Sequence, residues 1–280
     1  MENLKALSYD LRKDVVDIIM EGKAGHIGGD MSVIDILITL YYREMNISLD
    51  NLEDPNRDLF VLSKGHAVEA LYAVLASKGF LDLEEVKAGF SKFGTRYIGH
   101  PNNKLPGIEM NSGSLGHGLS VCTGMALAAR MDRRTSRVYT VMGDGELAEG
   151  SVWEGAMAAG HYKLDNLCAV VDRNRLQISG STEEVMSQDS QEERWASFGW
   201  HVISVPDGND MDQLHRAFEE AGRTKGQPSV IIAYTVKGCG SPVMENQAGW
   251  HHRVPTAEEY QQIISDFARE KEACCHESNT

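Results

Sequence analysis

The sequence has no cysteine pattern that would build a disulfide framework or a zinc cluster. Its five cysteines are an odd number and lack the paired spacing of a metal site. Two of them, Cys122 and Cys168, sit within apolar segments, so we interpret the cysteines as reduced thiols. The motif Cys274-Cys275-His276 lies in a polar tail without a second cluster, and this disfavours a zinc site there.

Long apolar runs are also missing. No stretch approaches the roughly 20 consecutive apolar residues that a helix needs to cross a bilayer. Residues 1–20 place apolar side chains at helical spacing with charges on the other side, which predicts an amphipathic helix and not a secretion signal. We therefore predict a cytoplasmic protein that does not contact a membrane.

Basic residues are scarce compared with acidic ones. The 27 lysines and arginines face 41 aspartates and glutamates, so the formal net charge is -14. This balance argues against a nucleic-acid surface, and any anion site must be local. With 280 residues and 42% hydrophobic content, the chain can bury the core of one large α/β domain or two modest ones.

Strand and helix patterns alternate along the chain. Strands are predicted at residues 58–63, 138–142, 167–171, 201–205 and 229–236, and helices at 4–20, 32–42, 67–78, 119–131, 149–163, 191–198, 211–223 and 256–271. Loops are predicted at 22–29, 89–110 and 176–188, with a loose tail at 273–280. No repeat or linker divides the chain, so we expect a single domain over residues 1–280. The predicted fold is α/β, with a doubly wound, mainly parallel sheet and helices on both faces.

Asp144 lies between two glycines directly after the predicted strand 138–142. The glycines let backbone N–H groups approach an anion closely, and the Asp144 carboxylate is a hard oxygen ligand. Asn174 follows the next predicted strand, and a right-handed crossover brings both strand ends to the same edge of the sheet. The two side chains could then share one cation that bridges a phosphate. A tight turn is the alternative for the Gly-Asp-Gly motif taken alone.

Three histidines lie in segments suited to ligand contact. His26 stands among four glycines, His66 stands at a strand-to-helix junction, and His100 lies in the loop 89–110. Open α/β sheets bind ligands at such junctions, although a solvated loop histidine has the same sequence pattern. Lys237 follows the last predicted strand at the same edge of the sheet.

The glycine-rich segment 113–118 precedes the predicted helix 119–131. Its free N–H groups and the helix dipole could bind phosphate, or the segment could simply form a tight loop. We leave both interpretations open.

The Gly-Asp-Gly motif with a later asparagine resembles the thiamine diphosphate signature. Seven motifs occur in the order found in transketolases: Ala24-Gly-His26, Leu62-Ser-Lys-Gly-His66, Gly99-His-Pro101, Gly113-Ser-Leu-Gly116, Gly143-Asp-Gly-Glu-Leu-Ala-Glu-Gly150, Asp172-Arg-Asn174 and Trp250-His251. The resemblance covers nearly the whole chain, but only the family's amino-terminal, diphosphate-binding domain. The chain thus resembles the amino-terminal subunit of a split transketolase.

The resemblance implies a role for each matching residue. Metal ligands for Mg²⁺ or Ca²⁺ would be Asp144, Asn174 and the carbonyl of Leu176. Contacts to thiamine diphosphate would come from His66, Gly145, Lys237 and His251, with Gly113, Ser114 and Leu115 lining its rings. The reacting ketose would face His26, His100 and His251. Glu149 matches a family glutamate at the subunit interface that links two cofactor sites.

Two positions depart from the family pattern. After His26 the chain has Ile27-Gly28-Gly29, where relatives often carry proline and a small hydroxyl residue near the phosphate. One expected hydrogen bond is therefore missing. His117 stands where many relatives have glutamine, and we assign it no chemistry.

The resemblance also implies the reaction and the partner. Transketolases pass a two-carbon ketol unit from a ketose phosphate to an aldose phosphate, as in the pentose phosphate pathway. The activating glutamate and the phosphate-binding arginines belong to a pyrimidine-binding domain, which we expect on a partner chain, in an α₂β₂ assembly. Alternatives are the α subunit of a 2-oxoacid dehydrogenase, which the four histidines disfavour because polyol substrates need hydroxyl partners, and a non-catalytic cofactor-binding module.

Overall fold

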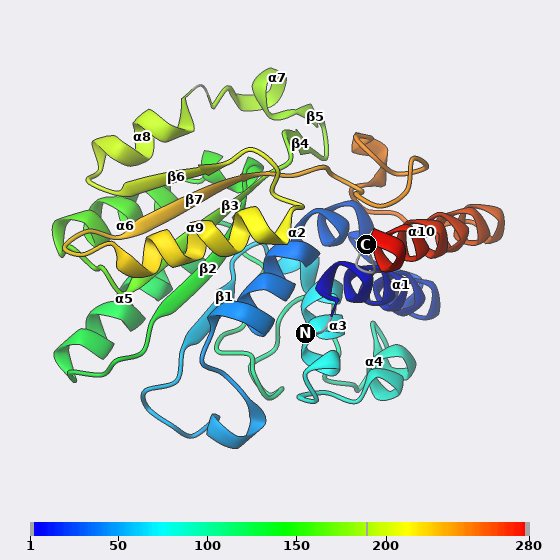
Figure 1. Cartoon of the computed structure of the whole chain (residues 1–280), viewed down its shortest axis with the longest axis horizontal. Coiled ribbons are helices and arrows are strands. Elements are labelled where there is room, and N and C mark those ends of the chain that lie inside the picture. Colours follow the sequence, from blue (N-terminus) through cyan, green and yellow to red (C-terminus); the bar gives the residue numbers. More distant parts are fainter. Residues whose placement is uncertain (1–2, 189, 278–280) are drawn as a thin grey trace.

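The computed structural model describes residues 3–188 and 190–277. Its centre is a sheet of five parallel strands in the order β1-β2-β3-β7-β6 (Figure 1). The strands are β1 (Leu59–Leu62), β2 (Val138–Gly143), β3 (Leu167–Arg173), β6 (His201–Val205) and β7 (Ser229–Tyr234). Because all five run the same way, their carboxyl ends meet at one edge, which is where open α/β sheets bind ligands.

Helices cover both faces of this sheet, as predicted. Successive residues of a strand alternate between two buried apolar clusters: in β2, for example, Tyr139 and Val141 belong to one cluster, whereas Val138 and Met142 belong to the other. The first cluster packs under α1 (Leu4–Gly22), α2 (Ile27–Thr39), α3 (Val68–Ser77) and α9 (Met211–Arg223); the second packs under α5 (Gly118–Met131), α6 (Gly150–His161) and α8 (Gln191–Ser197). A sheet covered on both faces explains the continuous apolar runs of β3 and β7.

Shorter elements connect this frame. They are η1 (Leu40–Glu44), η2 (Leu49–Asn51), η3 (Gly65–Ala67), α4 (Leu83–Gly89), η4 (Gly145–Ala148), β4 (Leu176–Gln177), β5 (Gly180–Ser181), α7 (Thr182–Met186) and η5 (Ala248–Trp250). The segment 176–188, predicted to be a loop, therefore contains a small hairpin and a helical turn. The sequence analysis did not predict α4 either.

The predicted loose tail is wrong where it can be checked. Helix α10 (Ala257–Glu277) continues through residues 273–277 and packs along α1, with Cys274 buried. Most residues of this stretch are polar, so its sequence did not reveal that one side of the helix is buried. Residues 278–280 lie outside the described part of the chain.

The predicted loop 22–29 is shorter than expected. Helix α2 already begins at Ile27, so Gly28 and Gly29 belong to its first turn and His26 is the residue before it. A Cβ atom on Gly28 would lie 2.7 Å from the carbonyl oxygen of Trp250, so this glycine permits close packing inside a helix.

The described residues contain no helix with the length and apolar character needed to cross a membrane. The structure shows no disulfide among the cysteines of the described part.

Candidate active site

A pocket of about 350 Å³ opens at the carboxyl edge of the sheet. Ten of the residues predicted for the site line it, and they come from seven separate segments of the chain: His26, His66, Gly113, Leu115, Asp144, Gly145, Asn174, Leu176, Lys237 and His251. The fold thus brings together side chains that are spread over most of the sequence. A pocket of this size suits a small-molecule cofactor or substrate.

Asp144 and Asn174 lie side by side because strands β2 and β3 pair in register, with Gly143 opposite Asp172. The Asp144 carboxylate accepts hydrogen bonds from the backbone N–H groups of Gly145 (2.9 Å) and Arg175 (2.5 Å). The Asn174 side-chain oxygen accepts one from the N–H of Leu176 (3.1 Å). These bonds fix the oxygens of the predicted cation site.

The charge around Asp144 favours an added cation. Burial, together with the nearby negative charge of Asp172, raises the pKa of Asp144 to about 6. A divalent cation beside this carboxylate would offset both effects. A carboxylate, an amide oxygen and the backbone carbonyl of Leu176 form an oxygen-only set, which suits Mg²⁺ or Ca²⁺. Within residues 3–188 and 190–277, no group of three or more His, Cys, Asp or Glu side chains offers a competing metal site.

Lys237 extends from the end of β7 toward the same place. Its ammonium group donates to the carbonyl oxygen of Leu176 at 3.4 Å and lies 3.0 Å from Nδ1 of His251. Burial and the positive charge of Lys64 lower the pKa of Lys237 to about 8. Lys237 and Lys64 are both buried at the pocket, and Lys237, which has no carboxylate partner in the described part of the chain, offers local positive charge to an anion beside Asp144 and Glu146.

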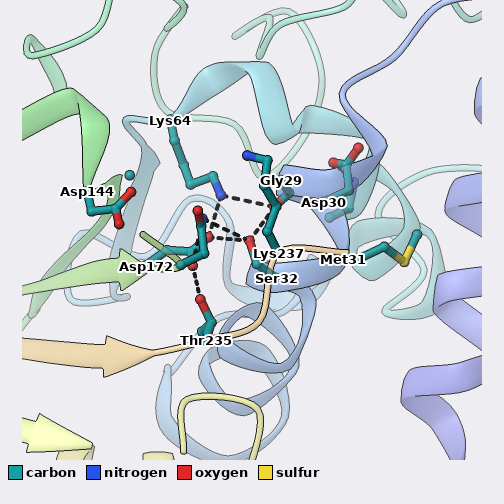
Figure 2. Close-up of polar contacts among 12 residues, drawn as sticks. Gly29, Asp30, Met31, Ser32, Lys64, Asp144, Asp172, Thr235 and Lys237 are labelled. Carbon is teal, nitrogen blue, oxygen red and sulfur yellow. Dashed lines mark hydrogen bonds and ion pairs between the residues drawn. The ribbon is translucent and has the colours of Figure 1, made fainter. Parts of the chain in front are cut away.

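Lys64 and Asp172 form a buried ion pair that the sequence analysis missed (Figure 2). Asp172 also accepts hydrogen bonds from Thr235 Oγ1 and from Ser32 Oγ at 2.6 Å, while Lys64 also donates to the carbonyl oxygen of Gly29 at 2.9 Å. Burial raises the pKa of Asp172, but the charge of Lys64 and these hydrogen bonds outweigh it and lower that pKa overall. Both residues stand inside recognised motifs, yet nothing in the local sequence indicates that Lys64, which follows β1, forms an ion pair with Asp172 of β3.

Glu146 is a second structural residue that the sequence analysis missed. Its buried carboxylate accepts hydrogen bonds from the N–H groups of Gly116 (2.8 Å) and Gly143 (3.1 Å) and from the hydroxyl of Ser63. Glu146 therefore joins three loops around the pocket. Its place inside the Gly143 to Gly150 motif was the available signal.

The glycine-rich segment before α5 forms a tight loop in which two of the N–H groups are already bonded. The N–H of Gly116 is bonded to Glu146, and the N–H of Gly118 donates to Ser63 Oγ at 3.2 Å. Because these donors already have partners, of the two interpretations left open by the sequence this geometry favours the loop.

The histidines gather around His26. The ring centroid of His26 lies 5.3 Å from His66, 5.9 Å from His251, 6.2 Å from His100 and 4.5 Å from His252. His252, which is exposed, had no predicted role. Nδ1 of His26 is buried and has no hydrogen-bond partner, so this nitrogen is left unsatisfied.

Burial keeps these imidazoles neutral. Burial and neighbouring positive charges lower the pKa of His26 to about 4 and that of His251 to about 3, and they also lower the pKa of His66 well below its ordinary value. Burial alone lowers the pKa of His100. Neutral imidazoles can accept hydrogen bonds and protons from hydroxyl groups near pH 7.

Three predicted site residues do not line the pocket. His100 borders it, since a Cβ atom on Gly113 would lie 2.7 Å from its ring. Ser114 and Glu149 are exposed, and Glu149 packs beside Gly116 at the start of α6. An interface with another chain would suit exposed residues, so the interface role of Glu149 stays a prediction.

Comparison with protein-family models identifies one domain. The family described as the transketolase, thiamine diphosphate binding domain matches residues 5–273. Over 279 residues the chain is 48% identical to one of the subunits of the apulose-4-phosphate transketolase of Phocaeicola vulgatus, covering 100% of this chain and 99% of that protein. It is 40% identical to the 6-deoxy-6-sulfo-D-fructose transketolase subunit SqwG of a Clostridium species, covering 93% and 94%.

Longer relatives match through part of their length. The chain is 38% identical to human transketolase, covering 95% of this chain but only 42% of that protein. Among solved structures, the transketolase of Pichia stipitis in complex with sedoheptulose-7-phosphate superposes with a TM-score of 0.87 at 29% identity, covering 99% of this chain and 44% of that one. The described chain therefore spans less than half the length of these two transketolases.

Proposed function

We propose that this chain, which belongs to the transketolase thiamine diphosphate-binding family, is the amino-terminal subunit of a two-chain transketolase. The enzyme would transfer a two-carbon ketol unit from a ketose phosphate to an aldose phosphate. The proposal rests on one observation. The side-chain oxygens of Asp144 and Asn174 and the neutral histidines belong to the same pocket. A 2-oxoacid substrate would leave most of these histidines without hydroxyl partners.

The part of the pocket around Asp144 and Lys237 would hold the diphosphate and its metal. Asp144, Asn174 and the carbonyl of Leu176 would bind Mg²⁺ or Ca²⁺, while Lys237, His66, His251 and the N–H of Gly145 would face the phosphate oxygens. Gly113 and Leu115, with Ser114 nearby, would border the rings. When bound, thiamine diphosphate supplies the nucleophilic carbon that makes cleavage of a ketose C2–C3 bond possible.

The part of the pocket around His26 would hold the sugar. His26, His100 and His251 would form hydrogen bonds with its hydroxyl groups and move protons during cleavage and transfer. Their neutrality near pH 7, which follows from burial, leaves His26 and His100 one nitrogen each that can accept a proton, whereas Nδ1 of His251 already lies 3.0 Å from the Lys237 ammonium group. The N–H on the other ring nitrogen can donate to a developing negative charge.

The rest of the active site would come from a partner chain. That partner would carry the pyrimidine-binding and carboxy-terminal domains and the groups that recognise the sugar's far end. The most similar proteins described above are named as subunits for apulose-4-phosphate and for 6-deoxy-6-sulfo-D-fructose, so we place the substrate among ketoses with a charged terminal group. We further propose one cytoplasmic domain per chain and an α₂β₂ assembly, with Glu149 near the contact between the two copies of this chain.

The test is co-purification with the candidate partner followed by a ketol-transfer assay. We expect no transfer by either chain alone and transfer by their mixture when magnesium and thiamine diphosphate are present. Full turnover by this chain alone, prepared from a host without transketolase, would overturn the two-chain proposal.

A further inference from the structure

Two buried acids behind the histidine cluster have no basic partner among their hydrogen bonds. Asp30 and Glu69 are both 0% exposed. One oxygen of Asp30 and both oxygens of Glu69 have no hydrogen-bond partner. The nearest buried cation, Lys64, is bound to Asp172, and in Figure 2 the Asp30 carboxylate points away from that pair. Buried polar atoms without partners call for an explanation.

The two acids occupy equivalent places on the two helices that follow the pocket histidines. Asp30 lies in the first turn of α2, just after His26, and Glu69 lies in the first turn of α3, just after His66. Asp30 Oδ1 accepts a hydrogen bond from the N–H of Ala70 at 3.0 Å, so it caps the start of α3 from a different helix.

Glu69 completes the connection in the opposite direction. A Cβ atom on Gly25 would lie 2.7 Å from Glu69 Oε1, so this carboxyl group lies directly against the turn that presents His26. Gly25 has a φ of 157°, and its missing side chain leaves the room that Glu69 fills. Asp30 of α2 therefore contacts the start of α3, and Glu69 of α3 contacts the turn before α2.

The charges of the two carboxyl groups are linked. Burial raises the pKa of Asp30 to about 7, while the hydrogen bond from the N–H of Ala70 and the charge of Lys64 oppose that rise. Burial and the negative charge of Asp30 raise the pKa of Glu69 well above its ordinary value, and burial with the charge of Glu69 raises that of Tyr72 nearby. One of two adjacent buried carboxyl groups keeps its proton because both cannot ionise together.

We propose that Glu69 donates one shared proton to the Asp30 carboxylate, and that this acid pair positions His26 and His66 by joining the first turns of α2 and α3. Asp30 and Glu69 are then positioning residues, since neither lines the pocket. No co-reactant is needed, because the proton stays between two oxygens. The effect on catalysis rests on the proposed function, whereas the effect on histidine geometry does not.

The first experiment follows the histidine ring signals of the full chain alone by NMR. Glu69→Gln keeps a donor to Asp30, so its ring signals for His26 and His66 should match the wild type. Glu69→Leu removes the donor and should shift both. Glu44→Gln is the control, because Glu44 is also a carboxyl group whose pKa burial raises, but it accepts from Tyr139 (3.0 Å) at the far end of β2.

The second experiment measures ketol transfer by the same variants assembled with the partner. Positioning predicts that Glu69→Leu lowers kcat by about tenfold or more and also weakens thiamine diphosphate binding through His66, and that Glu69→Gln stays within about threefold of wild type in both. Unchanged ring signals in Glu69→Leu, or equal shifts in Glu69→Gln and Glu69→Leu, would overturn the proposal. Shifted signals in Glu69→Leu alone, without ketol transfer by any assembly, would support the acid pair and reject the proposed function.

A double variant covers the case in which Glu69→Leu does not fold. Asp30→Asn with Glu69→Gln keeps a donor and an acceptor but has no proton to lose. Raising the pH should perturb the His26 and His66 signals of the wild type as the shared proton leaves, and the double variant should resist this change. Identical alkaline behaviour of the two proteins would overturn the proposal.

Discussion

Neutral histidine is the residue-level property on which the proposed chemistry depends. His26, His66 and His251 lie within 6 Å of one another by ring centroid, and burial lowers the pKa of each. Three positive rings at these distances would repel one another strongly. Burial prevents that repulsion by keeping the rings neutral, at some cost to stability in acid.

The histidines should differ in what they contribute. His26→Ala and His100→Ala should lower the ketol-transfer rate by about 100-fold or more while changing thiamine diphosphate affinity little, because they would face the sugar. His66→Ala should weaken both rate and cofactor binding. Steady-state kinetics and calorimetry of each assembly would measure this, and equal losses of affinity in all three variants would show that the roles are sorted wrongly.

The same histidines predict how stability changes with pH. An unfolded His26 takes up a proton near its ordinary value of 6.5, whereas the folded residue, with a pKa of about 4, does not. The folded protein therefore keeps its full stability above pH 6.5 and loses stability as the pH falls toward 4, because only the unfolded His26 takes up a proton in that range. His26→Asn should show a smaller loss of thermal stability between pH 7 and pH 5 than the wild type. Exposed His161→Asn is the control, and an unchanged pH dependence in His26→Asn would contradict the prediction.

At the scale of elements, the carboxyl ends of four strands and the loop before α5 form the pocket wall. Glu146 holds these parts together through Gly116, Gly143 and Ser63. A Cβ atom on Gly118 would lie 2.4 Å from the Ser63 side chain, so the start of α5 has no room to spare. The close packing of α5 against Ser63, just after β1, therefore helps to hold Ser63 where it donates to Glu146.

Two glycines of α5 should respond in opposite ways to the same substitution. Gly118→Ala should lower the free energy of unfolding by about 1–3 kcal/mol, because its methyl group overpacks against Ser63. Gly124→Ala should raise the free energy of unfolding by about 0.5–1 kcal/mol, since a Cβ atom there meets open space. Denaturant unfolding of the isolated chain would measure both. A destabilised Gly124→Ala beside an unaffected Gly118→Ala would show that the packing of α5 is described wrongly.

The elements differ in how well their sequences predicted them. The bounds of β6 and α9 coincide with the predicted ones, since both have a clear period of apolar residues. All thirteen residues of α2 are buried, so its sequence has no polar face and its start was placed too late. Lys64–Asp172 and Asp30–Glu69 were not predicted, because pairing across separate elements leaves no local pattern. The predicted residues that line the pocket were found through motifs at strand ends, through glycine-rich segments such as those at His26 and Gly113, and through the family resemblance.

At the scale of the whole molecule, an acidic chain carries a pocket in which buried charges of both signs meet. The net charge is -14, yet Lys64 and Lys237 are both buried at the pocket wall, with Asp144 and Glu146 beside them. A diphosphate would pair with Lys237, and a divalent cation would in turn neutralise Asp144 and the added phosphates. The proposed enzyme therefore divides its active site, with the diphosphate end and its metal on this chain and the activating groups on the partner.

Thiamine diphosphate binding by the assembled enzyme tests this division most directly. Calorimetry would compare assemblies that contain the wild-type chain, Asp144→Ala or Asp132→Ala, the last being an exposed control at the end of α5. Loss of the one carboxylate in an oxygen-only site should abolish magnesium-dependent binding in Asp144→Ala without preventing assembly, while Asp132→Ala should bind like the wild type. Unchanged thiamine diphosphate affinity in the Asp144→Ala assembly would contradict the account.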